Sequence, residues 1–216
     1  MAIAPEEVEE LFRASGAFLE GHFVLSSGRH SPKYLEKFQV LQWPKRTERL
    51  CAAIVERVRG LAIDTVAGPT TGGIILAHEV GRQLDVRAVY AERDEAGTGR
   101  VLRRGSEVRP GERVLVVDDI MSTGGSVEGT IAAVRAAGAT VVGAAVLVDR
   151  SGGKAHTSGV PHLALWEVAM ESYDPASCPQ CAKGEPIRKP GTTPAPEAAA
   201  PKGAGAAGAV RKGARR

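Results

Sequence analysis

The sequence predicts an α/β fold, with an open and mainly parallel sheet covered by helices on both faces. Two observations predict it. Short runs of aliphatic and β-branched residues alternate with helical patterns between residues 44 and 148, and this alternation implies crossover connections between parallel strands. The run Val-Leu-Val-Val at 114–117 has no polar residue, which is the pattern of a strand buried on both faces.

Each element follows from a local pattern. Pro5 suits the first turn of a helix, Glu6 complements its positive end, and Val8 and Phe12 recur at helical spacing. These residues predict a helix over 5–15. The same periodicity predicts helices over residues 44–59, 74–84 and 126–137. Runs rich in β-formers predict strands over residues 65–67, 88–91, 113–117 and 140–148.

Composition narrows the class of protein. With 216 residues, 43% apolar and 25% charged, the chain matches an average globular protein and can bury a core. No run approaches the roughly 18 apolar residues of a membrane helix, so we expect no membrane association.

The first 16 residues carry acids where a signal peptide carries positive charge. Three cysteines are too few for a disulfide framework, and we expect a cytoplasmic protein.

The charge is unevenly distributed. The chain carries a net +3, but the segment from Lys183 onward holds eight basic and two acidic residues, which leaves the body mildly acidic. We therefore expect no nucleic-acid partner for the body. Residues 189–216 include nine alanines, five glycines and four prolines, too few apolar side chains to offset the ordering entropy. The sequence predicts a single domain over 1–188 and a disordered basic tail over 189–216, which is interpreted as a solubilising segment.

The most informative segment is 114–127. Asp118 and Asp119 follow the buried strand, and the small residues 122–126 lead into a helix. Open α/β sheets bind ligands at this end of their strands. Glycines let backbone N–H groups approach a phosphate, hydroxyls add donors, and the helix N-terminus adds partial positive charge. The segment therefore predicts a phosphate-binding loop.

The order of residues selects among phosphate ligands. Neither GxxxxGK[ST] nor GxGxxG occurs in this turn. Two acids before the loop fit a sugar phosphate, because carboxylates can hold vicinal ribose hydroxyls or Mg²⁺ while the loop holds the 5′-phosphate. An ordinary strand end with capping acids would explain neither the paired aspartates nor the small residues after them.

The segment resembles the phosphoribosyl pyrophosphate (PRPP) motif of type I phosphoribosyltransferases. The resemblance implies that family's open sheet with a small N-terminal hood. It also implies that Asp118 and Asp119 act on the ribose during catalysis. The implied PRPP-binding residues of this motif are Asp118, Asp119, Ile120, Met121, Ser122, Thr123, Gly124, Gly125 and Ser126.

Residues 16–37 are similar to the N-terminal region of orotate phosphoribosyltransferases. Ser27, Gly28, Ser31 and Pro32 match an SGxxSPxY-like run, and the hood is expected at about 16–40. The resemblance implies orotate contacts from Tyr34 and Leu35. A surface hairpin with a turn at residues 27–28 remains an alternative for this segment.

Two further stretches resemble the same family. Residues 66–77 read as a strand, a turn and a helix start, and imply a pyrophosphate site at Thr70, Thr71 and Gly72. Residues 146–153 end a strand with Arg150, which the resemblance assigns to orotate together with Ser122. A planar guanidinium suits a carboxylate.

The chain departs from the family in three places. Many orotate enzymes have lysine at the position of Ser26 and another near Gly72, and neither is present. The loop over 91–102 is short and lacks the lysine and histidine of longer forms. Arg93 is the candidate that replaces them as catalytic and PRPP-binding cation, ahead of Arg100, Arg103 and Arg104. Gly97 and Gly99 predict a loop that can close over the site.

The remaining motif is the pair Cys178 and Cys181. A structural zinc ion usually needs four ligands, so this pair could hold one only across a dimer or with a histidine. A redox role needs a helix start after a strand, which the surroundings do not clearly provide. Packing of the C-terminal segment is the favoured interpretation. The five histidines are scattered in the sequence and suggest no metal site: His22, His30, His78, His156 and His162.

The resemblance implies an orotate phosphoribosyltransferase of pyrimidine (UMP) biosynthesis, which converts orotate and PRPP to orotidine 5′-monophosphate and pyrophosphate. It implies Mg²⁺ as the cofactor, bound mainly through PRPP rather than by a dedicated protein site, and a homodimer. Two alternatives remain at this point. A purine-type phosphoribosyltransferase would keep the PRPP motif, and a PRPP-binding regulator would have lost catalysis.

Overall fold

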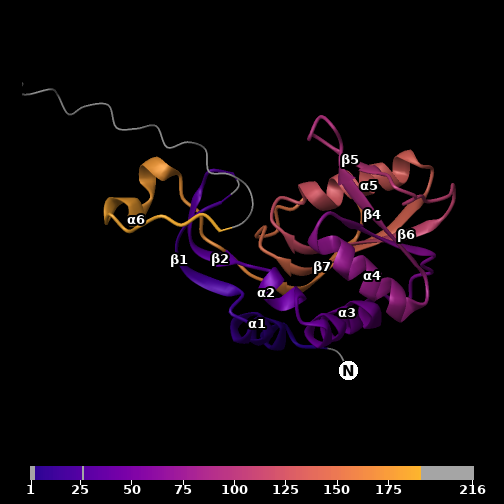
Figure 1. Cartoon of the computed structure of the whole chain (residues 1–216), viewed down its shortest axis with the longest axis horizontal. Coiled ribbons are helices and arrows are strands. Elements are labelled where there is room, and N and C mark those ends of the chain that lie inside the picture. Colours follow the sequence, from indigo (N-terminus) through magenta and orange to yellow (C-terminus); the bar gives the residue numbers. More distant parts are fainter. Residues whose placement is uncertain (1–2, 26, 191–216) are drawn as a thin grey trace, which may run out of the picture.

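The computed structural model describes residues 3–25 and 27–190. A six-stranded sheet forms the main body, and a two-stranded sheet forms a small lobe beside it (Figure 1). The main sheet contains β3 (Thr65–Pro69), β4 (Arg87–Arg93), β5 (Arg100–Leu102), β6 (Arg113–Met121), β7 (Thr140–Asp149) and β8 (His162–Glu167). The small sheet contains β1 (Phe18–Val24) and β2 (His30–Leu35).

Strand order in the main sheet is β5-β4-β3-β6-β7-β8. The neighbours from β4 to β8 pair in parallel, and β5 is antiparallel to β4. The prediction of an open, mainly parallel α/β sheet is confirmed. After β3 the chain adds β4 on one side, and after β6 it adds β7 and β8 on the other. The strand order therefore reverses between β3 and β6, which is where open α/β sheets bind ligands.

Helices cover both faces of the main sheet. The longer helices are α1 (Pro5–Ala14), α3 (Pro44–Val58), α4 (Gly72–Leu84) and α5 (Gly125–Ala136), and α2 (Phe38–Leu41) is a single turn. Along β6, Leu115 and Val117 belong to the core under α1, α3 and α4, whereas Val116 packs with residues of α5. Alternating side chains of one strand thus fill two cores, which explains its uninterrupted aliphatic run.

The predicted helices and strands are all present, with boundaries that differ by a few residues. One difference affects the site. Strand β6 continues through Met121, because Ile120 and Met121 still pair with Val148 and Asp149 of β7. The two aspartates therefore lie within the last residues of the strand and not beyond it.

The predicted loop over 91–102 is instead a β-hairpin in which Arg93 pairs with Arg100. Its turn is closed by hydrogen bonds from the backbone N–H of Asp94 to Gly99 O (3.1 Å) and of Thr98 to Asp94 Oδ1 (2.9 Å). Strands β5 and β8 were not predicted, since each is short and carries charged or mixed residues at its ends.

The small lobe joins the N-terminal hairpin to the end of the described chain. It contains β1, β2, the 3₁₀ turn η1 (Pro175–Ser177) and the short helix α6 (Pro179–Ala182). Arg188 donates its backbone N–H to His22 O at 2.7 Å, and Tyr173 pairs with His30. The predicted hood is thus a hairpin that the C-terminal segment completes. Ser26 and most of the predicted tail lie outside the described residues. No helix in the described part has the length and apolar character to cross a membrane.

Candidate active site

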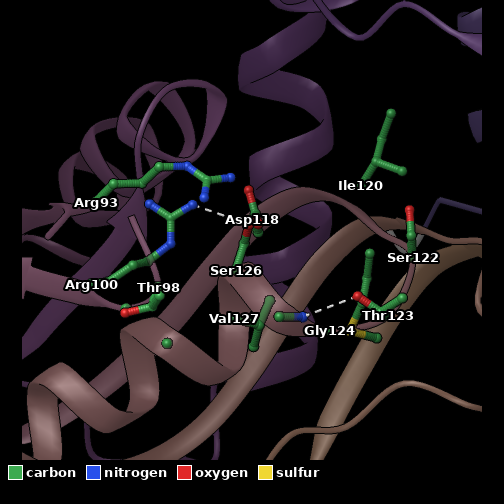
Figure 2. Close-up of a pocket in the computed structure, with 14 residues that line it drawn as sticks. Arg93, Thr98, Arg100, Asp118, Ile120, Ser122, Thr123, Gly124, Ser126 and Val127 are labelled. Atoms are coloured by element: carbon green, nitrogen blue, oxygen red, sulfur yellow. Dashed lines mark hydrogen bonds between the residues drawn. The ribbon is translucent and has the colours of Figure 1, made fainter. Parts of the chain in front are cut away.

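A cavity of about 380 Å³ opens at the carboxyl end of β6. The hairpin β4–β5 forms one wall and the loop between β6 and α5 forms the other (Figure 2). The lining residues are Arg93, Thr98, Gly99, Arg100, Asp118, Ile120, Met121, Ser122, Thr123, Gly124, Gly125, Ser126, Val127 and Gly129. The structure therefore brings most of the predicted PRPP-binding residues of this motif into one cavity.

The loop over 122–126 presents backbone donors to this cavity. Gly124 has φ +89° and precedes α5 without any side-chain cap. A Cβ at Gly124 would overlap the carbonyl oxygen of His156, so this position requires glycine both for its conformation and for space. Gly124 has no side chain to cap the helix, and the N–H of Gly125 makes only a long 3.5 Å hydrogen bond to Thr123 Oγ1, so the first N–H groups of α5 remain available to an anion. This arrangement suits a phosphate.

Asp118 lines the cavity, whereas the neighbouring Asp119 lies against Lys37 and Gly72, and the two side chains are buried, at 6% and 2% exposed, respectively. Burial, followed by the charge of Asp119, raises the pKa of Asp118 to about 8. Burial also raises the pKa of Asp119, while Lys37 opposes that rise. Burial thus disfavours the ionised form of both carboxyls in the absence of ligand, and a cation bound at the site would favour that ionised form.

Asp119 has one buried oxygen, Oδ2, without a hydrogen-bond partner among the described residues. This oxygen occupies the space in which a Cβ at residue 72 would lie, so Gly72 lets the pyrophosphate turn approach the acidic pair. Carboxylate oxygens of this kind can accept hydrogen bonds from ribose hydroxyls or bind Mg²⁺. The residues present therefore fit a magnesium ion that reaches the site with a phosphorylated sugar.

Lys37 is a site residue that sequence reasoning missed. Its Nζ lies 3.1 Å from Asp119 Oδ1, and it stands between β2 and α2. Its only signal in the sequence was its place at the end of the segment that resembles orotate enzymes. Nothing local to residue 37 shows that the chain returns to the carboxyl end of β6.

Arg100 is fixed in the cavity more firmly than Arg93. Its guanidinium donates to Thr70 Oγ1 (3.2 Å), Ala91 O (3.1 Å) and Ser126 Oγ (3.0 Å). Arg93, by contrast, donates to Gly97 O within its own hairpin turn, at 3.3 Å. The prediction ranked Arg93 first, but both arginines line the cavity and Arg100 joins the turn after β3 to the start of α5.

The other two loop cations point elsewhere. Arg103 pairs with Glu95 at 3.2 Å and Arg104 with Glu92 at 2.7 Å. Neither arginine lines the cavity. The structure thus pairs both arginines with carboxylates of the same hairpin, and a contact of either with PRPP stays a prediction.

A second polar region adjoins the loop on the side of β7. Arg150 donates its Nε hydrogen to Ser122 Oγ at 2.7 Å and its backbone N–H to Met121 O at 2.9 Å. Burial lowers the pKa of Arg150, and Tyr34 opposes that fall. Burial raises the pKa of the half-buried Tyr34, which the charges of Lys37 and Arg150 oppose. Tyr34, Arg150 and Ser122 thus form one region from three distant segments.

Leu35 does not join this region. Its side chain is buried in the main hydrophobic core. Successive side chains of a strand point to opposite faces, so when Tyr34 faces the polar region, Leu35 packs inward. The Leu35 side chain therefore does not line this region, and an orotate contact at Leu35 stays a prediction that only its backbone could fulfil.

The pyrophosphate turn follows β3. Thr70 accepts the hydrogen bond from Arg100, Thr71 precedes α4, and Gly72 is its first residue. The turn therefore lies across the strand-order reversal from the β6 loop, although its residues do not line the cavity itself.

Comparison with known proteins agrees with this geometry. The profile of the phosphoribosyl transferase domain matches residues 38–173. The chain is 46% identical to the orotate phosphoribosyltransferase of Desulforamulus reducens over 87% of this chain and 96% of that protein. It is 48% identical to that of Pelotomaculum thermopropionicum over 87% and 97%.

Solved structures agree as well. The orotate phosphoribosyltransferase of Aeropyrum pernix superposes with a TM-score of 0.65 at 30% identity, covering 74% of this chain and 93% of that one. Adenine phosphoribosyltransferase from Thermoanaerobacter pseudethanolicus, at 18% identity and a TM-score of 0.61 over 76% and 99% of the two chains, shares the fold. The sheet, the acidic pair and the phosphate loop define a type I phosphoribosyltransferase, and the chain belongs to this family. Within it, the chain falls among the orotate phosphoribosyltransferases.

Proposed function

We propose that the described cavity transfers the 5-phosphoribosyl group of PRPP to N1 of orotate. The C1′–O bond to pyrophosphate breaks, pyrophosphate leaves with the bonding electron pair, and the deprotonated N1 supplies the pair for the new bond. The products are orotidine 5′-monophosphate and pyrophosphate. The reaction belongs to pyrimidine biosynthesis, and no covalent intermediate with the protein is needed.

The contact between Arg150 and Ser122 carries the proposal. Ser122 starts the loop that would bind the 5′-phosphate, and Arg150 hydrogen-bonds to it at 2.7 Å. A guanidinium binds a planar carboxylate through two parallel hydrogen bonds, so orotate held here would lie beside the bound sugar. A base without a carboxylate would gain less from this arginine, which favours orotate over adenine or hypoxanthine.

The acidic pair supports the sugar part of the reaction. As the C1′–O bond breaks, positive charge develops on the ribose. Asp118 and Asp119 lie in a buried environment, where negative charge stabilises a developing cation more strongly than in water. Lys37 holds one oxygen of Asp119, so the pair is oriented before the substrate binds. Catalysis would come from this preorganisation and from positioning.

The arginines of the β4–β5 hairpin support the proposal that this cavity binds the pyrophosphate group of PRPP. Arg100 spans Thr70 and Ser126, the turn and the helix start on either side of the cavity. A cation at that point lies where a PRPP molecule would extend from the 5′-phosphate loop to the turn after β3. Arg93 adds a second positive charge at the cavity wall.

Magnesium is the cofactor we propose. Asp118 and the unpartnered Oδ2 of Asp119 are the oxygens that would approach it. When bound, it would offset the charge of the leaving pyrophosphate. We also propose that the protein acts in the cytoplasm as a homodimer, and that residues 189–216 take no part in transfer.

Orotate consumption tests the function directly. The full chain, supplied with PRPP and Mg²⁺, should consume orotate in a spectroscopic assay and leave adenine, hypoxanthine, xanthine and uracil unchanged in parallel assays. The matched control is Asp118→Asn with Asp119→Asn, which should bring the rate to background while near-UV circular dichroism stays the same. Consumption of a purine in place of orotate would overturn the proposal.

A further inference from the structure

A second cluster of chemically active side chains lies outside the active site, in the small lobe. His22 comes from β1, His30 from β2, and Cys178 and Cys181 from the segment around α6. One atom of each residue lies within 4.8 Å of the corresponding atoms of the other three. No other group of three or more potential metal ligands occurs within residues 3–25 and 27–190. The structure thus brings together with the cysteines two histidines whose spacing in the sequence suggested no metal site.

The distances match the edges of a metal tetrahedron. His22 Nε2 lies 3.1 Å from His30 Nδ1, 3.5 Å from Cys178 Sγ and 3.7 Å from Cys181 Sγ. Cys181 Sγ lies 3.2 Å from His30 Nδ1. Zinc bonds of about 2.3 Å to sulfur and 2.0–2.1 Å to nitrogen, at tetrahedral angles, require roughly 3.6 Å between sulfur and nitrogen and 3.3 Å between nitrogens. Each of these separations lies within about half an ångström of that geometry.

The orientation of His22 supports a ligand role. Its Nδ1 lies 3.0 Å from the carbonyl oxygen of Glu185. A carbonyl oxygen only accepts hydrogen bonds, so Nδ1 carries the proton and the Nε2 of the neutral ring offers its lone pair to the cluster. A metal-bound histidine is commonly oriented in this way by a hydrogen bond from its other ring nitrogen to a carbonyl group.

Contacts within the protein leave this cluster poorly satisfied. His22, His30 and Cys178 are buried and Cys181 is half-buried. Thiols are weak hydrogen-bond donors, and two imidazole nitrogens that face each other can share only one proton between them. A divalent cation would be bound by all four atoms at once.

The lobe also lacks a hydrophobic core of its own. The three hydrophobic clusters of the described chain contain no residue from 173–188. Backbone pairing at Tyr173 and Arg188 and the hydrogen bond from Gln180 to Gly21 O attach this segment to the hairpin. Small units that cannot build a core are commonly held together by a structural metal ion.

We propose that His22, His30, Cys178 and Cys181 bind one Zn²⁺ ion in a closed, structural site. Two sulfur and two nitrogen ligands in a tetrahedron favour zinc. Four protein ligands leave no open position, so the ion would take no part in the transfer reaction. Its role would be to join the hairpin, which carries Tyr34 and leads to Lys37, to the C-terminal segment.

Metal content is the first test. The full chain, purified without an affinity tag and without added metal, should contain about one zinc per chain by elemental analysis, the ratio that a four-ligand site requires. Cys178→Ser with Cys181→Ser should lower that content at least tenfold. Cys51→Ser and His162→Gln are matched controls from outside the cluster and should retain the zinc. Wild-type protein that contains no zinc, or holds iron instead, would overturn the proposal.

A spectroscopic test does not depend on how well the variants fold. Wild-type protein stripped with a chelator and reloaded with Co²⁺ should show the intense visible bands of tetrahedral cobalt and a thiolate-to-cobalt charge-transfer band. Chelation should also lower the thermal midpoint of the wild type, and Zn²⁺ should restore it. Absence of the cobalt bands, or a Cys178–Cys181 disulfide found by mass spectrometry in freshly purified protein, would contradict the zinc site.

Discussion

At the scale of single residues, the active site combines charges that burial makes unfavourable in the ligand-free protein. Asp118 and Asp119 are nearly inaccessible to solvent, and both pKa values are raised. Lys37 offsets part of this cost at Asp119. Burying these two carboxylates lowers the stability of the folded protein. The same buried negative charges favour substrates that bring or develop positive charge.

The first prediction concerns Asp118 and pH. Its folded pKa of about 8 lies above its ordinary value. Between about pH 4 and pH 8 the unfolded chain has therefore released a proton that the folded chain retains, and stability falls as pH rises. Asp118→Asn removes this dependence. The free energy of unfolding in urea should be higher for the variant than for wild type at pH 8, and the difference should shrink at pH 5.

A tenfold difference in proton affinity corresponds to about 1.4 kcal/mol, so the effect is measurable. The control is Asp85→Asn, at an exposed position with φ 57° that asparagine tolerates. It should follow the wild-type pH dependence. A constant difference between Asp118→Asn and wild type across this range would contradict the raised pKa.

The second prediction concerns base recognition. Arg150→Ala should raise the KM for orotate about 10- to 150-fold, since a charge-assisted contact contributes roughly 1.5–3 kcal/mol. The KM for PRPP should change little. Steady-state kinetics with each substrate varied in turn measure both constants. Arg150→Lys retains the charge without the planar guanidinium and should recover only part of the loss, whereas equal effects on both substrates would assign Arg150 a structural role.

At the scale of elements, the geometry of the site depends on two connections, the loop between β6 and α5 and the turn between β3 and α4. Strand β6 passes directly into the loop that precedes α5, and the turn after β3 reaches Asp119 because Gly72 has no side chain. The hairpin β4–β5 then covers the cavity with Arg93 and Arg100. Loop conformation, more than the helices themselves, determines the geometry of the predicted phosphate site.

Gly124→Ala tests that loop. The added Cβ would overlap the His156 carbonyl, and φ +89° is costly for alanine, so the loop must shift. We expect a destabilisation on the order of 1–3 kcal/mol together with a large rise in the KM for PRPP. Thermal unfolding and initial rates measure the two effects.

Gly111→Ala separates conformational strain from loop displacement. Gly111 has φ +80°, but no atom lies within 4 Å of the position that an added Cβ would take, and the residue belongs to the turn before β6. This variant should lose stability while its KM for PRPP stays at the wild-type value. If Gly124→Ala also left that KM unchanged, the loop would not be the phosphate site.

At the scale of the whole molecule, a main body carries the chemistry and a small lobe lies beside it (Figure 1). The lobe reaches the active site through β2, which bears Tyr34 and leads to Lys37. The end of the described chain pairs with β1 through Arg188. The N-terminal hairpin and the segment that ends at Arg188 are thereby connected to the region proposed to bind the base.

The fourth prediction concerns sharing of sites in a homodimer. Arg93 lines the cavity of its own chain and donates a hydrogen bond to Gly97 O of its hairpin turn, whereas Arg100 donates one to Ser126 at the start of α5. The resemblance to orotate phosphoribosyltransferases implies instead that, in a homodimer, the hairpin around Arg93 closes over the neighbouring subunit's site, and the two arrangements can be told apart. Inactive Asp118→Asn/Asp119→Asn chains mixed with inactive Arg93→Ala chains should then recover activity, because some dimers hold one intact site.

Arg100→Ala chains provide the matched control for this mixture. Arg100 and the aspartates belong to the same site, so mixing these two chains pairs two damaged sites and should restore nothing. Subunit exchange is followed with chains of different mass. Failure of the Arg93 mixture to recover, with exchange demonstrated, would mean that each site is built from one chain.

The fifth prediction concerns the C-terminal tail. Removal of residues 189–216 should leave both the thermal midpoint and orotate turnover close to wild type, because the segment offers a single large aliphatic side chain, Val210, to pack. Truncation after Tyr173 is the contrasting variant, since it removes the backbone pairing of Arg188 and both cysteines. A large loss after the shorter deletion would show that the tail docks on the body.

The sequence by itself determined the features that depend on neighbouring residues. A few consecutive residues predict each of four features: the parallel sheet, the acidic pair, the predicted phosphate loop and the turn after β3. The reason is that the preferences for strands, turns and helix N-termini depend on neighbouring residues. Only the tertiary structure decided the features that join distant segments. Lys37 reaches Asp119, Leu35 turns into the core, and Arg100 is anchored more firmly than Arg93. His22 and Cys181 meet across 159 positions of sequence, because packing and side-chain direction, and not spacing, set which groups come together.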